Sequence, residues 1–268
     1  MKKYMALLKY ELKTIFKDSM GLFMMFYPLL MLFITGFLLP EILARTTTPD
    51  SNASAITLLI GFVVTLSIGG YIMGVMLGFS LLENKDENTL QNIAASPVRI
   101  SGYTLFKTTY TYFLALIGNW VMVGGLKLIA SSKYQVTYQS VTIGLLDQIT
   151  WGHVAIYAFV SSLIVPAVAL VVAAVAKNKI EGFAFMKSGG LVIMMPLLAL
   201  LNVFLDWKQY LLGIFPNFWY VKPLLNIALS LEQEANMSFY LYMVIGAIYT
   251  IGLSFLTYRL FMKKANLK

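Results

Sequence analysis

Six long apolar runs constrain this chain more than any other feature of its sequence. Each run holds roughly 20 mostly apolar residues, the length that an α-helix needs to cross the hydrocarbon core of a bilayer. Hydrophobic residues make up 59% of the chain and charged residues only 12%, too few to cover a soluble protein of this size. We therefore predict a single all-α transmembrane domain over 1–268, a polytopic membrane protein with six transmembrane helices over 20–39, 55–82, 108–130, 154–176, 188–205 and 239–262.

Lys and Arg are distributed unequally between the segments that flank these runs. Fifteen of the 20 basic residues lie at the two ends of the chain, in 83–107, or between the fourth and fifth runs, whereas the 12 acidic residues divide evenly. An excess of basic residues marks the cytoplasmic side of a membrane protein. We expect a multi-pass protein of a bacterial cell membrane with both termini in the cytoplasm. The net charge of +8 reflects this sorting and not a nucleic-acid partner.

The N-terminal 19 residues have the pattern of an amphipathic helix that lies on the inner membrane surface. Apolar residues recur at steps of three and four, and most lysines take the opposite face; the apolar positions are Met5, Leu8, Leu12, Ile15 and Phe16. A plain solvated helix that leads into the first span is the alternative. The charged region is too long for a signal peptide, and no small-residue cleavage site follows the apolar run.

The segment 206–236 is the longest connection on the outer side. It contains the interfacial aromatic residues Trp207, Trp219 and Tyr220, together with Pro216 and Pro223. Because proline interrupts helices, we predict two short helices that dip into the outer leaflet in a re-entrant manner.

Several catalytic signatures are absent from the sequence. There is no phosphate-binding loop, no HExxH motif and no nucleophile elbow, and the chain has no Cys. The single histidine, His153, stands at the outer end of a run and is expected to be a polar anchor. No Asp, Glu or Arg lies deep inside a run, which disfavours a carrier driven by an ion gradient. The chain is not expected to be an enzyme or to bind a metal or cofactor.

Small and polar residues inside the runs suggest how the helices associate. Gly70, Gly74 and Gly78 form a ridge at four-residue spacing, which favours close helix packing, either within one subunit or at a moving or dimerising interface along the pathway. Kinks are expected where prolines interrupt the spans, at Pro28, Pro166 and Pro196. Hydrogen bonds between helices are expected from Asn119 and Asn202.

The polar stretch 83–98 separates the second and third runs and is expected to be cytoplasmic. We predict a link over 83–86 followed by a helix of about two turns, capped by Asn88 and stopped by Pro97. Asp86 and Glu87 would lie near the positive end of that helix, and Leu90, Ile93 and Ala94 would share one face. A helix this short is not stable alone in water, so it must dock on a partner.

The run ENTLQNIAASPV resembles the segment that follows the second span in the ABC type-2 exporter permeases. Lys85 and Asp86 match the end of that family's charged cluster, Thr89 and Leu90 match its Thr-Leu pair, and the ending matches at Ser96, Pro97 and Val98. Asn88 stands where the family usually has Gly, and Gln91 stands where it usually has Glu. The resemblance extends over essentially the full length of the chain, including the proline-bearing outer segment.

The resemblance implies that this chain is half of a transporter's membrane part. It would assemble with a second permease, identical or homologous, and with ATPase subunits that bind ATP and Mg; membrane lipids would surround it. The helix after the second span would sit in a groove of the ATPase and transmit its closure. The substrate path would run between the two permeases, lined partly by the second and fifth spans.

Three classes of function are weighed. The first is an ABC exporter permease whose cargo is amphipathic or hydrophobic, such as a drug or an antimicrobial or toxin-like peptide, because the membrane interior is rich in aromatic residues and Met. Within that class the alternative is export of a polysaccharide or lipid-linked glycan. The second class is a stand-alone channel or secondary carrier. The third is an intramembrane enzyme or an assembly scaffold.

Overall fold

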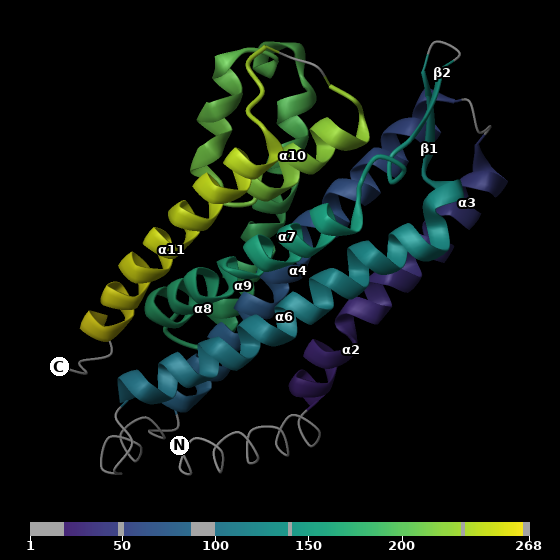
Figure 1. Ribbon diagram of the computed structural model, residues 1–268. Coiled ribbons are helices and arrows are strands. Elements are labelled where there is room, and N and C mark those ends of the chain that lie inside the picture. Colours follow the sequence, from purple (N-terminus) through teal and green to yellow (C-terminus); the bar gives the residue numbers. More distant parts are fainter. Residues whose placement is uncertain (1–18, 48–50, 87–99, 139–140, 232–233, 265–268) are drawn as a thin grey trace.

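The computed structural model describes residues 19–47, 51–86, 100–138, 141–231 and 234–264, which form a bundle of long helices (Figure 1). Six helical stretches in these residues are long and apolar enough to cross a membrane. They are Met25–Thr46, Asn52–Asn84, Ser101–Lys133, Trp151–Val175, Ile180–Leu200 and Phe239–Lys264. The prediction of an all-α protein with six transmembrane helices is therefore confirmed.

The first span is built from three successive helical pieces. α2 (Ser19–Phe33) contains Pro28, the π-helix η1 (Ile34–Leu38) follows directly, and α3 (Leu39–Thr46) has Pro40 in its first turn. Pro40 cannot donate an N–H to the turn before it, and the π-helix η1 lies at the place where this hydrogen bond is lost. The helical stretch therefore continues past residue 39, where the sequence predicted its end.

α4 (Asn52–Asp86) is the longest helix and runs through the bundle between several others. It packs against α6 (Ile100–Ala130), α8 (Ile164–Val175) and α9 (Lys179–Met194). The link predicted over 83–86 is instead the last turn of α4. These four residues include no Gly or Pro, so nothing in them ends the helix.

The fourth span consists of α7 (Trp151–Ser162) and α8, which are interrupted at Leu163. Pro166 has no N–H to donate to the carbonyl of Ser162, four residues earlier, so the helix cannot continue regularly through this point. The kink predicted at Pro166 is thus a break near the middle of the span.

His153 helps to fix the start of α7. Its backbone N–H donates to Thr150 Oγ1 at 3.3 Å, and the backbone N–H of Thr150 donates to His153 Nδ1 at 3.2 Å. This reciprocal cap satisfies backbone donors that have no partner inside the helix. The histidine therefore acts as a local capping residue.

The fifth span begins earlier than predicted, because the residues before Lys187 contain a start signal for α9. Asn178 Oδ1 accepts a hydrogen bond from the backbone N–H of Glu181 at 3.0 Å, and Glu181 Oε2 accepts one from the backbone N–H of Lys177 at 2.8 Å. Asn followed three residues later by Glu is a recognisable N-terminal pattern. Lys187, which we assigned to the loop before this span, lies inside α9.

The end of the fifth span changes helix type. α9 passes into the 3₁₀ helix η3 (Met195–Leu200), and Pro196 stands at the change, as the predicted kink requires. A further short 3₁₀ helix, η4 (Asn202–Phe204), follows. Asn202 is exposed, so its predicted role as a buried partner between helices is wrong.

The outer segment contains the 3₁₀ helix η5 (Trp207–Ile214) and α10 (Phe218–Ala228), the two short helices predicted for 206–236. Pro216 lies between them, whereas Pro223 lies inside α10 and does not break it. Trp219 Nε1 donates to the carbonyl of Gly213 at 2.8 Å, which holds the two helices together. Whether they dip into the leaflet remains a prediction.

A small hairpin follows the third span. After η2 (Ser131–Lys133), strands β1 (Gln135–Tyr138) and β2 (Val141–Gly144) pair antiparallel. Lys127 Nζ donates to the carbonyl of Leu146 at 2.8 Å, which ties the end of α6 to the chain beyond the hairpin.

α11 (Phe239–Lys264) is the sixth span and packs mainly against α8 and α10. Figure 1 shows that the start of α2, the end of α4, the start of α6 and the end of α11 lie at one end of the bundle. The hairpin and α10 lie at the opposite end. The buried core follows this axis, with one cluster around α7 and α10 and another around α6 and α8.

Candidate functional site

The glycine ridge of the second span packs against the fourth span of the same chain. A Cβ atom placed on Gly70 would lie 2.5 Å from the carbonyl oxygen of Ser161, and one placed on Gly74 or Gly78 would lie 2.7 Å from Cβ of Val168 or Val172. Only glycine leaves room for so close an approach. The structure thus places Gly70 against the junction of α7 with α8, and Gly74 and Gly78 against α8, as the reading of packing within one subunit requires.

Asn119 connects three helices beside this ridge. Its Nδ2 donates to Ser161 Oγ at 2.9 Å and to Ser162 Oγ at 3.0 Å, and its side chain fills the notch above Gly69. α4, α6 and α7 are therefore joined at the break in the fourth span. The hydrogen bond between helices that the sequence predicted for Asn119 is present.

Two glycines of α9 allow the fifth span to pack closely against the second span. Gly182 faces the ring of Phe79, and Gly189 faces the ring and hydroxyl of Tyr71, so α9 accepts two aromatic side chains of α4. Tyr71 OH also donates to the carbonyls of Phe185 and Met186, each at 3.4 Å. In the most apolar stretch of this span only 22% of the residues are buried, so α9 contacts the bundle along one narrow face.

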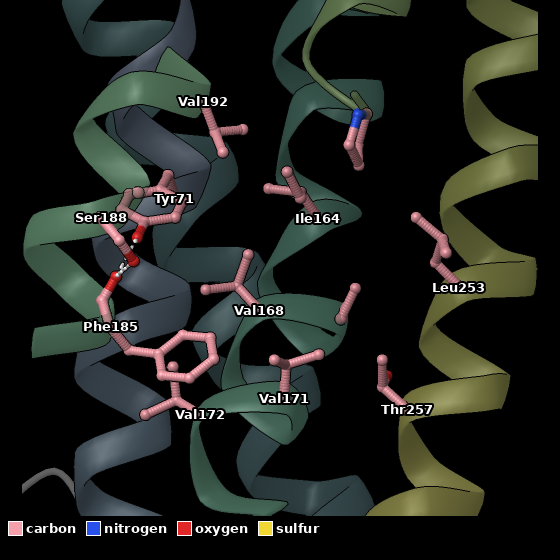
Figure 2. Close-up of a pocket in the computed structure, with 13 residues that line it drawn as sticks. Tyr71, Ile164, Val168, Val171, Val172, Phe185, Ser188, Val192, Leu253 and Thr257 are labelled. Carbon is pink, nitrogen blue, oxygen red and sulfur yellow. Dashed lines mark hydrogen bonds between the residues drawn. The ribbon is translucent and has the colours of Figure 1, made fainter. Parts of the chain in front are cut away.

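An apolar cavity of about 260 Å³ opens between these helices (Figure 2). α8 supplies Ile164, Val168 and Val171, α9 supplies Phe185, and α11 supplies Leu253. Figure 2 shows α9 and α11 on opposite sides of α8, with Phe185 on one wall and Leu253 on the other. The cavity thus lies between the second, fourth, fifth and sixth spans.

The polar groups of the cavity are hydroxyls. Tyr71, Ser188 and Thr257 line it, and Ser188 Oγ already donates to the carbonyl of Phe185 at 2.8 Å. None of the residues that line the cavity is charged. Such a site suits an apolar or aromatic body with a few hydrogen-bonding groups, and its volume is slightly below the roughly 300–1,000 Å³ typical of ligand pockets.

The described residues contain no group of three or more His, Cys, Asp or Glu side chains that could hold a metal ion. The cavity also brings together no pair of acid and base and no activated nucleophile. Its lining offers apolar contacts and a few hydroxyl groups.

Most of the predicted coupling segment lies outside the described residues. Lys85 and Asp86 belong to the last turn of α4, and α6 begins at Ile100. The predicted contacts of Glu87, Asn88, Thr89, Leu90, Ile93, Ala94, Ser96 and Pro97 fall in the interval between the two helices, which the structure does not describe.

The contact between α4 and α9, which forms one wall of the cavity, was not predicted from the sequence. Gly182 and Gly189 are seven residues apart, and Phe79 and Tyr71 are eight apart, so both pairs recur after two helical turns. This matched spacing of small and aromatic residues is the sequence pattern from which a contact between α4 and α9 could have been predicted.

A family model described as "Fluoroquinolones export permease protein Rv2686c-like" matches residues 11–258 of the chain. The chain belongs to this family. No curated protein and no solved structure matches it.

Membership in this family of export permeases agrees with the six spans and with the resemblance to ABC type-2 exporter permeases. The match begins before the first span and ends within the sixth, so it includes the cavity and the segment 83–98. The protein is a multi-pass export permease, and the cavity is its candidate substrate site.

Proposed function

We propose that this export permease is the membrane subunit of an ATP-driven exporter whose cargo is an amphipathic aromatic compound of the fluoroquinolone kind. The observation that carries the proposal is the family match over 11–258, since the matched residues contain an uncharged, mostly aliphatic cavity beside the second span. The family description supports a fluoroquinolone-like cargo. The apolar lining of the cavity, which includes Tyr71 and Phe185, supports an apolar or aromatic cargo independently.

The cavity lining favours a drug over a glycan. A polysaccharide presents rows of hydroxyl groups and needs many hydrogen-bonding partners, whereas this cavity is mostly aliphatic and aromatic. The absence of Asp, Glu and Arg from its lining also gives no support to transport driven by an ion gradient. The resemblance to ABC type-2 exporter permeases supports a separate ATPase as the energy source.

The basic residues support cytoplasmic termini also when those inside the six spans of the structure are left out. Ten basic residues then remain on the side of the termini, against Lys208 and Lys222 on the other. The end of α4 and the start of α6 lie on that same side, so the segment 83–98 would face a cytoplasmic ATPase.

The coupling role is tested by joint purification of the permease with a candidate ATPase subunit. We expect Leu90→Asp, or deletion of 88–95, to lower drug-stimulated ATP hydrolysis at least tenfold, because a charge or a gap removes the apolar face that docks. Leu90→Met keeps that face apolar and should behave as the native chain. Membrane insertion is measured in parallel. ATPase capture that survives the deletion unchanged would show that the segment does not couple.

The cavity is tested by filling it. We expect Val171→Trp to lower uptake of a fluoroquinolone into inverted vesicles about tenfold, because the indole occupies much of a cavity of about 260 Å³. Val175→Trp, one turn further along α8 and outside the cavity lining, is the matched control. Equal loss in both variants, or in neither, would argue against the cavity as the substrate site.

A further inference from the structure

A second groove lies on the other side of α8 from the candidate substrate site. It has a volume of about 770 Å³ and runs between α6, the junction of α7 with α8, and α11. Leu105, Phe159 and Phe255 line it and are each more than half exposed, so the groove opens outward from the bundle. In a membrane, lipid acyl chains can reach this opening.

The groove has the depth of one lipid leaflet. Its lining on α6 extends from Ser101 to Tyr112, and its lining on α7 and α8 extends from Phe159 to Leu170, so each wall covers eleven helical steps. Eleven steps of ~1.5 Å correspond to about 16 Å. Half of a bilayer's hydrocarbon core is about 15 Å. The groove lies on the side of the bundle where α6 begins and α11 ends.

A cation stands at the edge of this groove. The guanidinium of Arg259 lies over the ring of Phe255, with 4.3 Å between its Cζ and the ring centroid. Lys263 and Lys264 follow one turn later and are exposed. A lipid that lay in the groove would therefore have its headgroup beside basic side chains. Basic pockets between helices on the cytoplasmic side are a recurrent site for anionic headgroups.

The wall of the groove also holds an unpartnered hydroxyl. Thr104 is only 1% exposed, and its Oγ1 has no hydrogen-bond partner among the residues that the structure describes. The hydroxyls of Thr108 and Thr109, also in the lining, are satisfied by carbonyls of their own helix. Because this oxygen is buried and the other two hydroxyls are already bonded, the groove offers a ligand mainly apolar contacts.

We propose that this groove is a binding site for one anionic phospholipid of the leaflet on the side of the termini. An acyl chain would fill the apolar groove, and the phosphate would lie beside Arg259. The assignment of this leaflet to the cytoplasmic side rests on the proposed orientation of the permease. The rest of the proposal does not depend on that orientation. The site is separate from the candidate substrate cavity, because the two share no lining residue.

The test is native mass spectrometry of the purified full-length permease, titrated with phosphatidylglycerol or with phosphatidylcholine of the same chains. We expect one phosphatidylglycerol to bind several-fold more tightly than phosphatidylcholine. Arg259→Gln should weaken that binding about fivefold, the effect of one basic residue near a membrane surface. Ser254→Trp, which fills the groove from α11, should abolish the binding of both lipids at this site.

Matched controls separate this site from general effects of charge and bulk. Lys133→Gln removes a cation that also lies over an aromatic ring, 5.4 Å from the centroid of Phe37, at the other end of the bundle. Ile248→Trp adds the same bulk to an exposed position of α11 outside the groove. Both should bind phosphatidylglycerol as the native chain does.

Three outcomes would overturn the proposal. Equal binding of the two lipids that no groove variant changes would show that the groove is not a lipid site. Loss of a dimer in Ser254→Trp with unchanged lipid binding would identify a second copy as the occupant. Loss of fluoroquinolone binding with unchanged lipid binding would identify the cargo. The lipid measurement requires no ATPase, so failed coupling cannot produce a false result here.

Discussion

Lys222 places an ammonium group in the interior of α10, a helix that is not among the candidate spans. It is fully buried, and its Nζ has no hydrogen-bond partner among the described residues. Burial lowers the pKa of this amine from 10.5 to about 8. The folded protein therefore releases its proton near pH 8, while the unfolded chain keeps it until about pH 10.5. Stability should rise with pH between these values and be flat below them.

We expect Lys222→Met to raise the free energy of unfolding at neutral pH by at most roughly 3 kcal/mol, because it removes a buried charge and keeps the aliphatic chain. The variant should also lose the rise in stability between pH 8 and 10.5. Thermal unfolding in detergent across this pH range measures both effects. Lys208→Met, at an exposed lysine that pairs with Asp206 at 3.0 Å, should leave the pH profile unchanged. A lower melting temperature for Lys222→Met would show that the amine has a stabilising partner.

The contact between α4 and α8 depends on the absence of side chains along one ridge. A Cβ on Gly74 would lie 2.7 Å from Val168 Cβ and 3.1 Å from the carbonyl oxygen of Val165. We expect Gly74→Leu to separate the helices and to destabilise the protein by roughly 1–3 kcal/mol, the usual effect of overpacking. In α11, Gly252 has no atom within 4 Å of its Cβ position, so Gly252→Leu should be tolerated. Fluorescence-detected gel filtration after heating measures the difference. Equal stability of the two variants would mean that α4 and α8 can adjust to a larger residue.

At the scale of the whole molecule, α9 forms one wall of the candidate substrate cavity, and we expect this wall to move during transport. α9 is attached mainly through the two notches for Phe79 and Tyr71, and the cavity is slightly small for a drug-sized ligand. We expect a cysteine pair, Phe185→Cys with Leu253→Cys, to lower the rate of uptake at least tenfold when a cleavable bismaleimide links the two cysteines across the cavity. Reduction of the linker should restore uptake. The chain has no native Cys, so the reagent reacts only at the introduced positions.

The single-cysteine variants, treated in the same way, control for the presence of the reagent in the cavity. They should retain most of the uptake of the untreated protein. Full activity of the linked pair would show that α9 and α11 keep a fixed separation during transport, and the cavity would then need another route of opening.

Features that depend on local pattern could be predicted from the sequence. Six apolar runs, the prolines Pro166 and Pro196 that break or change helices, and the two short outer helices all follow from composition and backbone chemistry, whereas Pro28 lies inside α2 without ending it. The error in the fifth span was also local, because Asn178 and Glu181 signal its start. Pro223 was misread because a helix can keep a proline where packing compensates, and α10 is almost entirely buried.

The sequence by itself determined that this protein is a six-span membrane bundle with a polar segment after the second span. Hydrophobic length, the bias of basic residues and helix punctuation are properties of neighbouring residues, so they can be read along the chain. Only the tertiary structure decided that the ridge of Gly70, Gly74 and Gly78 meets α8, that α9 rests on Tyr71 and Phe79, and that Lys222 is buried. Inside a membrane the hydrophobic effect does not favour one partner helix for a glycine ridge over another. The partner therefore depends on how all the helices of the bundle pack together.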